Sequence, residues 1–292
     1  MAKNLISVLQ LGTIDYATGL RLQEKLVALR KEGRIGDVLL LLEHALVITL
    51  GRNAKSANIV ASPETLAQRG VEVFECDRGG DVTFHGPGQL VAYPIFDLRG
   101  FSSSSENRTT MGVIEFVRNL EEVLIWTCAE FGIPAKRIAG LTGVWTEGAA
   151  AQEVAGSSAQ PDGRGRPSPH GSVEPTSSEH EAKIAALGIH ISRGVTSHGI
   201  ALNVNTDLSF FDLIVPCGIT SKPVTSIQKE LGRELAMQDV AHALSRNFGL
   251  VFRSQILWLD SLDSLLGNNV GVPVRPPENL RKLSGEDETA WA

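Results

Sequence analysis

The stretch that constrains the fold most strongly is RGGDVTFHGPGQ, residues 78–89. Apolar alternation predicts a strand before it, over 71–76, and another after it, over 89–96. Five of its residues are Gly or Pro, and paired glycines allow a backbone to approach a ligand closely. Arg78 and His85 add polar groups, so the stretch is interpreted as a binding loop, with a tight connection between strands as the alternative. It does not match a phosphate loop, because no helix follows it and the Gly-Lys-Ser/Thr ending is absent.

Further strands are predicted on both sides of this stretch from continuous or alternating apolar runs. Pro94 lies within the run 89–96, and because proline lacks an N–H, that strand is expected at a sheet edge or at a bulge. The predicted strands cover 6–11, 38–42, 46–50, 71–76, 89–96, 142–146, 183–191, 199–204 and 250–253.

Helices are predicted where apolar residues recur at three and four positions, over 16–31, 110–131 and 238–248. Asp15 is placed to cap the first of them, and Ser62 followed by Pro63 indicates another helix start. Strands and helices do not alternate regularly. This order predicts an α/β or α+β fold, a sheet with helices packed on its face.

Composition excludes several classes of protein. The chain has 292 residues and a formal net charge of −6, which argues against a broad surface for nucleic acid. No apolar run approaches the roughly 20 residues that span a bilayer, and the start does not match a signal peptide, so we expect a cytoplasmic protein that does not bind membranes. Its three cysteines are scattered, without the spacing of a disulfide framework or a metal site.

The composition changes abruptly over 147–182, which contains no aromatic residue and no Leu, Ile or Met. Such a segment buries too little apolar surface to offset the entropy lost on ordering. It is predicted to be a disordered surface insertion, and the alternative is an extended arm packed on a partner. The tail over 268–292 is Pro-rich and polar and is expected to be loose. We therefore predict one domain over 1–253.

Several motifs, taken together and in order, resemble the lipoyl(octanoyl) transferases. The loop RGGDVTFHGPGQ is similar to the signature loop of that family. The likeness continues in GLTGVW (140–145), KIAALGI (183–189), HGIALNVN (198–205), VPCGI (215–219) and VTSI (224–227). It covers about 6–250, and it implies the mixed, largely antiparallel sheet with flanking helices found in biotin and lipoate protein ligases.

The resemblance also implies a reaction. An octanoyl group leaves the phosphopantetheine thiol of octanoyl-acyl carrier protein for an enzyme cysteine, and a lysine of a lipoyl domain then takes it as an amide. The acceptors implied are the lipoyl domains of 2-oxoacid dehydrogenases and the glycine cleavage H protein. The incoming thioester is already activated, so no metal and no cofactor are expected. We also expect a monomer.

Carried over by position, the nucleophile is Cys217 and its partner is Lys183. As an ammonium, Lys183 favours the thiolate, and as an amine it can take the proton of the attacking substrate lysine. His85 and His198 are rival candidates for the base, because Cys–His pairs are a common nucleophile arrangement.

The family's substrate contacts fall on three segments with many small residues, as a narrow tunnel for an unbranched chain requires. The residues are Arg78, Gly79, Gly80, Asp81, Val82, Thr83, Phe84, His85, Ala186, Leu187, Gly188, Gly199, Ile200 and Ala201.

Three other readings remain open at this point. An ATP-dependent lipoate- or biotin-protein ligase of the same fold would make an acyl adenylate and would need no thiol. A binding protein could keep the pocket without catalysis. A cysteine hydrolase would release free acid if water reached the acyl-enzyme.

Overall fold

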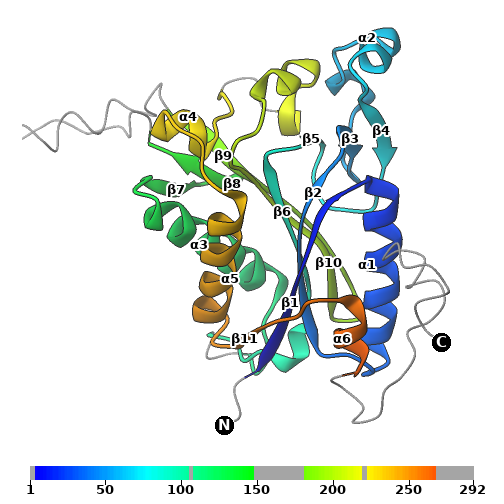
Figure 1. Ribbon diagram of the computed structural model, residues 1–292, viewed down its shortest axis with the longest axis vertical. Coiled ribbons are helices and arrows are strands. Elements are labelled where there is room, and N and C mark those ends of the chain that lie inside the picture. Colours follow the sequence, from blue (N-terminus) through cyan, green and yellow to red (C-terminus); the bar gives the residue numbers. More distant parts are fainter. Residues whose placement is uncertain (1–3, 105–107, 148–180, 219–221, 268–292) are drawn as a thin grey trace, which may run out of the picture.

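The computed structural model describes residues 4–104, 108–147, 181–218 and 222–267. Within these residues the main feature is an eight-stranded sheet (Figure 1), in which β1 is parallel to both neighbours and the other pairs are antiparallel. The sheet is therefore mixed and largely antiparallel, which confirms the predicted fold class. In spatial order the strands are β11 (Gln255–Trp258), β1 (Leu5–Ile14), β2 (Asp37–His44), β6 (Gln89–Ile95), β10 (Val195–Asn203), β9 (Ala182–Ser192), β8 (Leu141–Thr146) and β7 (Ala135–Ile138).

Helices cover both faces of this sheet (Figure 1). On one face lies α1 (Tyr16–Lys31), whose first turn is capped by the Asp15 carboxylate, and α6 (Leu262–Gly267) joins the same apolar cluster. On the other face α3 (Val113–Glu130) and α5 (Met237–Val251) pack over the larger apolar cluster. The strand predicted over 250–253 is wrong, because α5 continues to Val251 so that Phe248 and Phe252 both reach the core.

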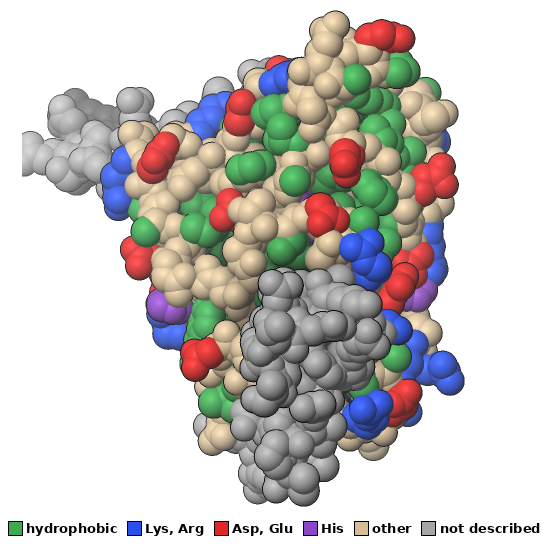
Figure 2. Space-filling view, turned by 45° about the vertical axis from the view of Figure 1, so that its right-hand side comes forward, with side chains coloured by type: hydrophobic (Ala, Val, Ile, Leu, Met, Phe, Trp, Pro, Cys, Tyr) green, Lys and Arg blue, Asp and Glu red, His purple; other side chains and the backbone are tan. Residues whose placement is uncertain are grey.

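A smaller sheet stands beside one end of the large one (Figure 1), with β3 parallel to β4 and antiparallel to β5. Its own apolar cluster joins it to α2 (Pro63–Gln68), which begins at the predicted cap Ser62, and to η4 (Leu208–Leu213). Figure 2 shows apolar side chains gathered over this part of the molecule, where Val60 and Val73 are exposed. Its strands are β4 (Glu72–Glu75), β3 (Val47–Leu50) and β5 (Val82–His85).

Pro94 does not lie on an edge strand, because β6 is between β2 and β10. Its missing N–H coincides with an interruption of the β6–β10 ladder. There the His198 N–H donates to Gln23 Oε1 of α1 (2.7 Å), and the Thr196 hydroxyl donates to the Pro94 carbonyl (2.6 Å). The proline is tolerated because side chains take over the bonds of the ladder.

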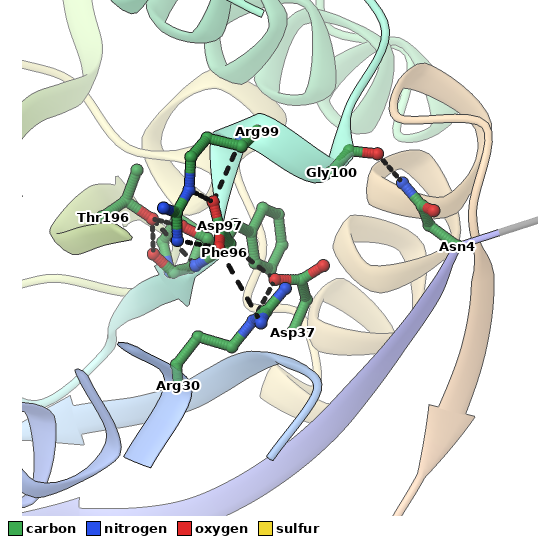
Figure 3. A network of polar contacts seen from close by, with 9 residues as sticks. Asn4, Arg30, Asp37, Phe96, Asp97, Arg99, Gly100 and Thr196 are labelled. Carbon is green, nitrogen blue, oxygen red and sulfur yellow. Dashed lines mark hydrogen bonds and ion pairs between the residues drawn. The ribbon is translucent and has the colours of Figure 1, made fainter. Parts of the chain in front are cut away.

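A polar network fixes the end of α1 against the sheet (Figure 3). The Asp37 carboxylate is buried, and it accepts from Arg30 Nε and from the Asp97 N–H, both at 2.8 Å. Burial raises the pKa of Asp37, and the guanidinium of Arg30 opposes that rise. Asp97 in turn accepts from Arg99 Nη2 (2.7 Å). The network sets the position of α1, whose first residue, Tyr16, reaches the site described below.

The folded part extends past residue 253, because β11 pairs with β1 and α6 follows it. Most of the expected insertion, 148–180, and the tail 268–292 lie outside the described residues. Ala182, the last residue of the expected insertion, already belongs to β9. The preceding Glu181 forms ion pairs with Lys136 (2.8 Å) and Lys222 (2.5 Å). None of the helices in the described ranges is long and apolar enough to cross a membrane.

Candidate active site

The three predicted binding segments meet around one pocket, which we call the inner pocket. It encloses about 460 Å³ of empty space, its open mouth included. It lies between β6, β9 and β10 of the large sheet and β5 with its preceding loop. The predicted residues that line it are Arg78, Gly80, Asp81, Thr83, His85, Ala186, Leu187, Gly188, Gly199, Ile200 and Ala201.

Three residues of the predicted binding set do not line the inner pocket. Val82 and Phe84 face away because side chains alternate along β5, so that only Thr83 and His85 point inward. Phe84 instead stacks on Phe210 of η4, with ring centroids 5.0 Å apart. Gly79 lies behind the lining, where its N–H donates to the Ile189 carbonyl of β9 (2.9 Å).

Most of the Arg78 guanidinium group is engaged in hydrogen bonds within the protein. Its Nη2 donates to the Thr49 carbonyl (2.6 Å), and its Nη1 donates to the Gly79 carbonyl (3.0 Å). The side chain is only 7% exposed. A Cβ on Gly188 of β9 would lie 2.7 Å from the Gly79 carbonyl oxygen, so the loop reaches β9 only because that position is glycine. Arg78 thus fixes the loop that forms one wall of the pocket.

The floor of the inner pocket is an aromatic and histidine cluster. His44 Nε2 and the Tyr93 hydroxyl are 2.7 Å apart, and the rings of Tyr16 and His85 are nearly parallel with centroids 6.3 Å apart. Sequence reasoning missed Tyr16, His44 and Tyr93, and no motif could have found them, because they come from three elements that meet only in the fold. Burial raises the pKa of both tyrosines.

The histidines of this cluster are neutral at physiological pH. Burial lowers the pKa of His44 to about 4, and burial with the neighbouring His44 lowers the pKa of His85 to about 3. Burial also lowers the pKa of His198, although its Nε2 is 2.7 Å from the Asp77 carboxylate. A neutral His85 holds a hydrogen bond with Gln89 Oε1 (2.6 Å).

We expect the free energy of unfolding to fall as pH drops from about 6.5 towards 4. His44 and His85 stay neutral in the folded chain, whereas in the unfolded chain each binds a proton near its ordinary pKa of 6.5. Each should contribute a slope of about 1.4 kcal/mol per pH unit in this range. Urea unfolding at pH 5, 6 and 7 measures it, and the variant His44→Gln should show a smaller slope. A stability independent of pH from 7 to 5 would contradict this account.

A second cavity, the outer pocket, adjoins the inner one. The two share Thr83, Ala186 and Ala201, and the two alanines face each other across the β9–β10 ladder. Small side chains therefore form the neck between the pockets. The remaining lining of the outer pocket is Gln89, Lys183, Asn203, Phe211, Pro216 and Val224.

The outer pocket brings the Lys183 segment next to the turn that contains Cys217. The Lys183 N–H donates to the Pro223 carbonyl (2.8 Å), and the Lys183 carbonyl accepts from the Thr225 N–H (2.9 Å). Pro216, immediately before Cys217, lines the same pocket as Lys183. The backbone of Cys217 belongs to η5 (Pro216–Gly218), but its side chain lies outside the described part of the structure.

Asp81 and Asn58 hold the Cys217 turn against the loop 78–89. The Asp81 carboxylate accepts from Asn58 Nδ2 (2.5 Å), and the Asn58 carbonyl accepts from the Val215 N–H (2.7 Å). A Cβ on Gly218 would lie 3.1 Å from Asp81 Oδ2. Asp81 therefore supports the turn as well as lining the pocket.

The rival histidines lie around the inner pocket, and none of the residues found to line the outer pocket is a histidine. His85 is bound to Gln89 and His198 to Asp77. Among the residues that line the outer pocket, Lys183 is therefore the one whose side chain carries an amine that could act as the base. Cys128 is buried in α3, where burial raises the pKa of its thiol to about 12, and Cys76 donates weakly to the Leu50 carbonyl (3.4 Å).

Comparisons with known proteins give a consistent result. A family model described as the lipoyl protein ligase A/B catalytic domain matches residues 15–249. A relative named octanoyltransferase, from Koribacter versatilis (strain Ellin345), is 55% identical over 283 residues, which are 97% of this chain and 98% of the relative. Another octanoyltransferase, from Acidobacterium capsulatum, is 53% identical over 264 residues, 90% of this chain and 96% of the relative.

A solved structure shares the fold at low sequence identity. It contains a bi-partite lipoate protein ligase and its E2 lipoyl domain from Thermoplasma acidophilum, and it superimposes with a TM-score of 0.58 at 15% identity. The match covers 98% of this chain and 91% of that one. This likeness concerns the fold alone.

Proposed function

Because the chain belongs to the lipoyl protein ligase A/B catalytic-domain family, in which its relatives at 53–55% identity are octanoyltransferases, it is an acyltransferase, and we propose how it acts. Octanoyl-acyl carrier protein donates the octanoyl group to the Cys217 thiol. The resulting thioester then passes the group to a lysine of a lipoyl domain. Cys217 and Lys183 are proposed to carry out both steps, and the predicted residues that line the inner pocket are proposed to bind the acyl chain.

The observation that carries this proposal is the junction of the two pockets. The outer pocket brings Lys183 together with Pro216, the neighbour of Cys217, and it shares the small residues Ala186 and Ala201 with the inner pocket. A thioester formed on Cys217 can extend its acyl chain through this neck. Burying each methylene is worth about 0.8 kcal/mol, so a chain of about eight carbons brings several kcal/mol of binding free energy.

The chemistry consists of two acyl transfers. In the first, the Cys217 thiolate attacks the thioester carbonyl, a new C–S bond forms, and the phosphopantetheine thiolate leaves and takes up a proton. In the second, the amine of the acceptor lysine attacks the acyl-enzyme. An amide bond forms, the C–S bond breaks and Cys217 is released as thiolate. Lys183 takes the proton that the attacking amine loses.

The acceptor is proposed from the family and from the neighbouring structure. The Thermoplasma structure belongs to a study of a lipoate protein ligase and its E2 lipoyl domain, and this pairing supports a lipoyl domain as the acceptor proposed for this chain.

Intact mass spectrometry of the full chain tests the mechanism. The protein is mixed with octanoyl-acyl carrier protein in the absence of ATP, and peptide mapping locates any adduct. We expect the mass of one octanoyl group on Cys217, which disappears when a lipoyl domain is added and reappears on that domain. Absence of an adduct together with octanoylation only when ATP and octanoate are supplied would show a ligase instead. An adduct that decays to free octanoate without reaching the domain would show a hydrolase.

A further inference from the structure

The motif GLTGVW, 140–145, has no role in the reaction as proposed, yet the fold places part of it against Lys183. Gly143 lies in β8 with φ +133°, a conformation that side chains rarely adopt. A Cβ built there would be 2.8 Å from Lys183 Cε and 3.0 Å from the Ala185 carbonyl oxygen. The Lys183 side chain therefore lies directly over the space that a side chain at 143 would need.

The other end of the motif contacts the amine itself. Lys183 Nζ lies over the indole ring of Trp145, 4.9 Å from the centroid, and Trp145 is 1% exposed. A desolvated indole face attracts an ammonium group. The register of β8 and β9 also shifts here, with Val144 opposite Ala185 and Trp145 opposite Lys183, so Ile184 is left without a partner. Such bulges redirect side chains beside active sites.

A buried carboxylate of α3 holds the Gly143 backbone beside Lys183. Glu121 is fully buried, and its Oε1 accepts from the Gly143 N–H (3.3 Å). Its Oε2 accepts from Arg118 Nη1 (2.7 Å) and Arg137 Nε (3.0 Å). A buried carboxylate is stable in this place because two guanidinium groups and a backbone N–H compensate its desolvation. The anchor connects the backbone at Gly143 to a helix of the core.

From these contacts we infer that Gly143 and Glu121 are positioning residues for Lys183: Glu121 holds the Gly143 backbone in the conformation that leaves space for the lysine side chain beside Trp145. This inference rests on the proposed function, because it matters for turnover only if Lys183 acts in the transfer. It assigns to GLTGVW a role in placing the amine, while the substrate is bound elsewhere.

The first test compares two glycines of the same hairpin. Gly143→Ala should lower octanoyl transfer on the order of 10²-fold, the effect of displacing a reacting group by about 1 Å, with little change in the KM for octanoyl-acyl carrier protein. Gly140→Ala is the matched control, since Gly140 also has a positive φ (+80°) but no atom lies within 4 Å of its Cβ position. It should lose stability and keep its turnover. Equal turnover in the two variants would overturn the inference.

A double-mutant cycle separates positioning from simple damage to the fold. In a Lys183→Ala background, Gly143→Ala should lower turnover no further, because the group that it displaces is already gone. A loss of the same factor in both backgrounds would overturn the inference. If Gly143→Ala alone does not fold, thermal unfolding of the double variant gives the answer. Removing the Lys183 side chain should raise the unfolding temperature only in part, because the Cβ would still lie 3.0 Å from the Ala185 carbonyl oxygen at a φ of +133°. A double variant as unstable as the single one would count against the inference.

Substitutions of Glu121 provide an independent test of the inference. Glu121→Gln keeps an acceptor for the Gly143 N–H and should retain most turnover, whereas Glu121→Ala should lower it with the KM unchanged. Glu122→Ala is the control, because it removes one partner of Arg137 Nη2 and leaves that nitrogen its bond to the Arg118 carbonyl. Equal turnover of the alanine and glutamine variants would contradict the role of the anchor. Failure of the proposed function is recognised separately, because wild-type protein would then form no Cys217 adduct.

Discussion

Replacing Cys217 by serine is expected to reduce octanoyl transfer from octanoyl-acyl carrier protein to a lipoyl domain to the background rate. A thiolate exchanges acyl groups with an incoming thioester at nearly equal free energy, whereas a serine hydroxyl is a weak nucleophile near neutral pH without a strong adjacent base. No histidine lines the outer pocket to supply that base, as far as the described residues show. Intact mass of the acceptor domain over time measures the transfer, and circular dichroism checks the fold.

The other cysteines provide matched controls for this substitution. Cys76→Ser changes a partly buried thiol that donates to the Leu50 carbonyl and keeps a hydrogen-bonding group beside Tyr16, and transfer should stay within a few-fold of the wild type. The assay is run with and without ATP and free octanoate. Retained, ATP-dependent transfer by Cys217→Ser would replace the thioester mechanism with adenylation. Retained transfer without ATP would mean that a different residue holds the acyl group.

Lys183 substitutions should lower the overall rate about 10²- to 10⁴-fold, the usual contribution of a positioned acid–base group. Two variants separate its two roles. Lys183→Met removes both charge and base, so formation of the acyl-enzyme and transfer to the acceptor should both slow. Lys183→Arg keeps a cation near the Cys217 turn but cannot give up its proton, so the acyl-enzyme should form and then persist. Rapid quenching followed by intact mass of enzyme and acceptor resolves the two steps.

Lys229→Met is the control for these variants, because Lys229 is an exposed lysine of α4 (Ile227–Leu231) that does not line the outer pocket. It should keep wild-type rates in both steps. Normal transfer by Lys183→Met would exclude Lys183 from the chemistry. In that case the base would have to be sought among the histidines of the inner pocket or in the substrate itself.

Local pattern predicted most of the secondary structure. The strand runs 38–42 and 89–96, and the helix that begins after Asp15, correspond to elements of the fold because their patterning matches their burial. Two predictions were wrong where tertiary contacts outweighed local preference. Pro94 is accommodated in a central strand because Gln23 and Thr196 take over ladder bonds. Helix α5 continues past 250 because this places Phe248 and its C-cap residue Phe252 in the same apolar cluster.

The candidate site was predictable to a different degree. The motifs identified the family and three segments that meet around the inner pocket, because glycines and alanines that allow close approach of backbones form recognisable short stretches. Period-2 alternation on β5 could have excluded Val82 and Phe84 from the lining. Tyr16, His44 and Tyr93 had no such signal, since each looks like an ordinary residue of its own helix or strand.

The sequence alone determined the class of fold, the family and the loop 78–89, since these depend on local backbone preference and on motif order. Only the tertiary structure decided which side chains meet. Lys183 reaches the Cys217 turn because residues 223–225 pair with its backbone. It lies over Gly143 because Glu121, on helix α3, binds the Gly143 N–H in β8. Contacts between distant segments arise from packing the whole sheet, and no single stretch of the chain encodes them.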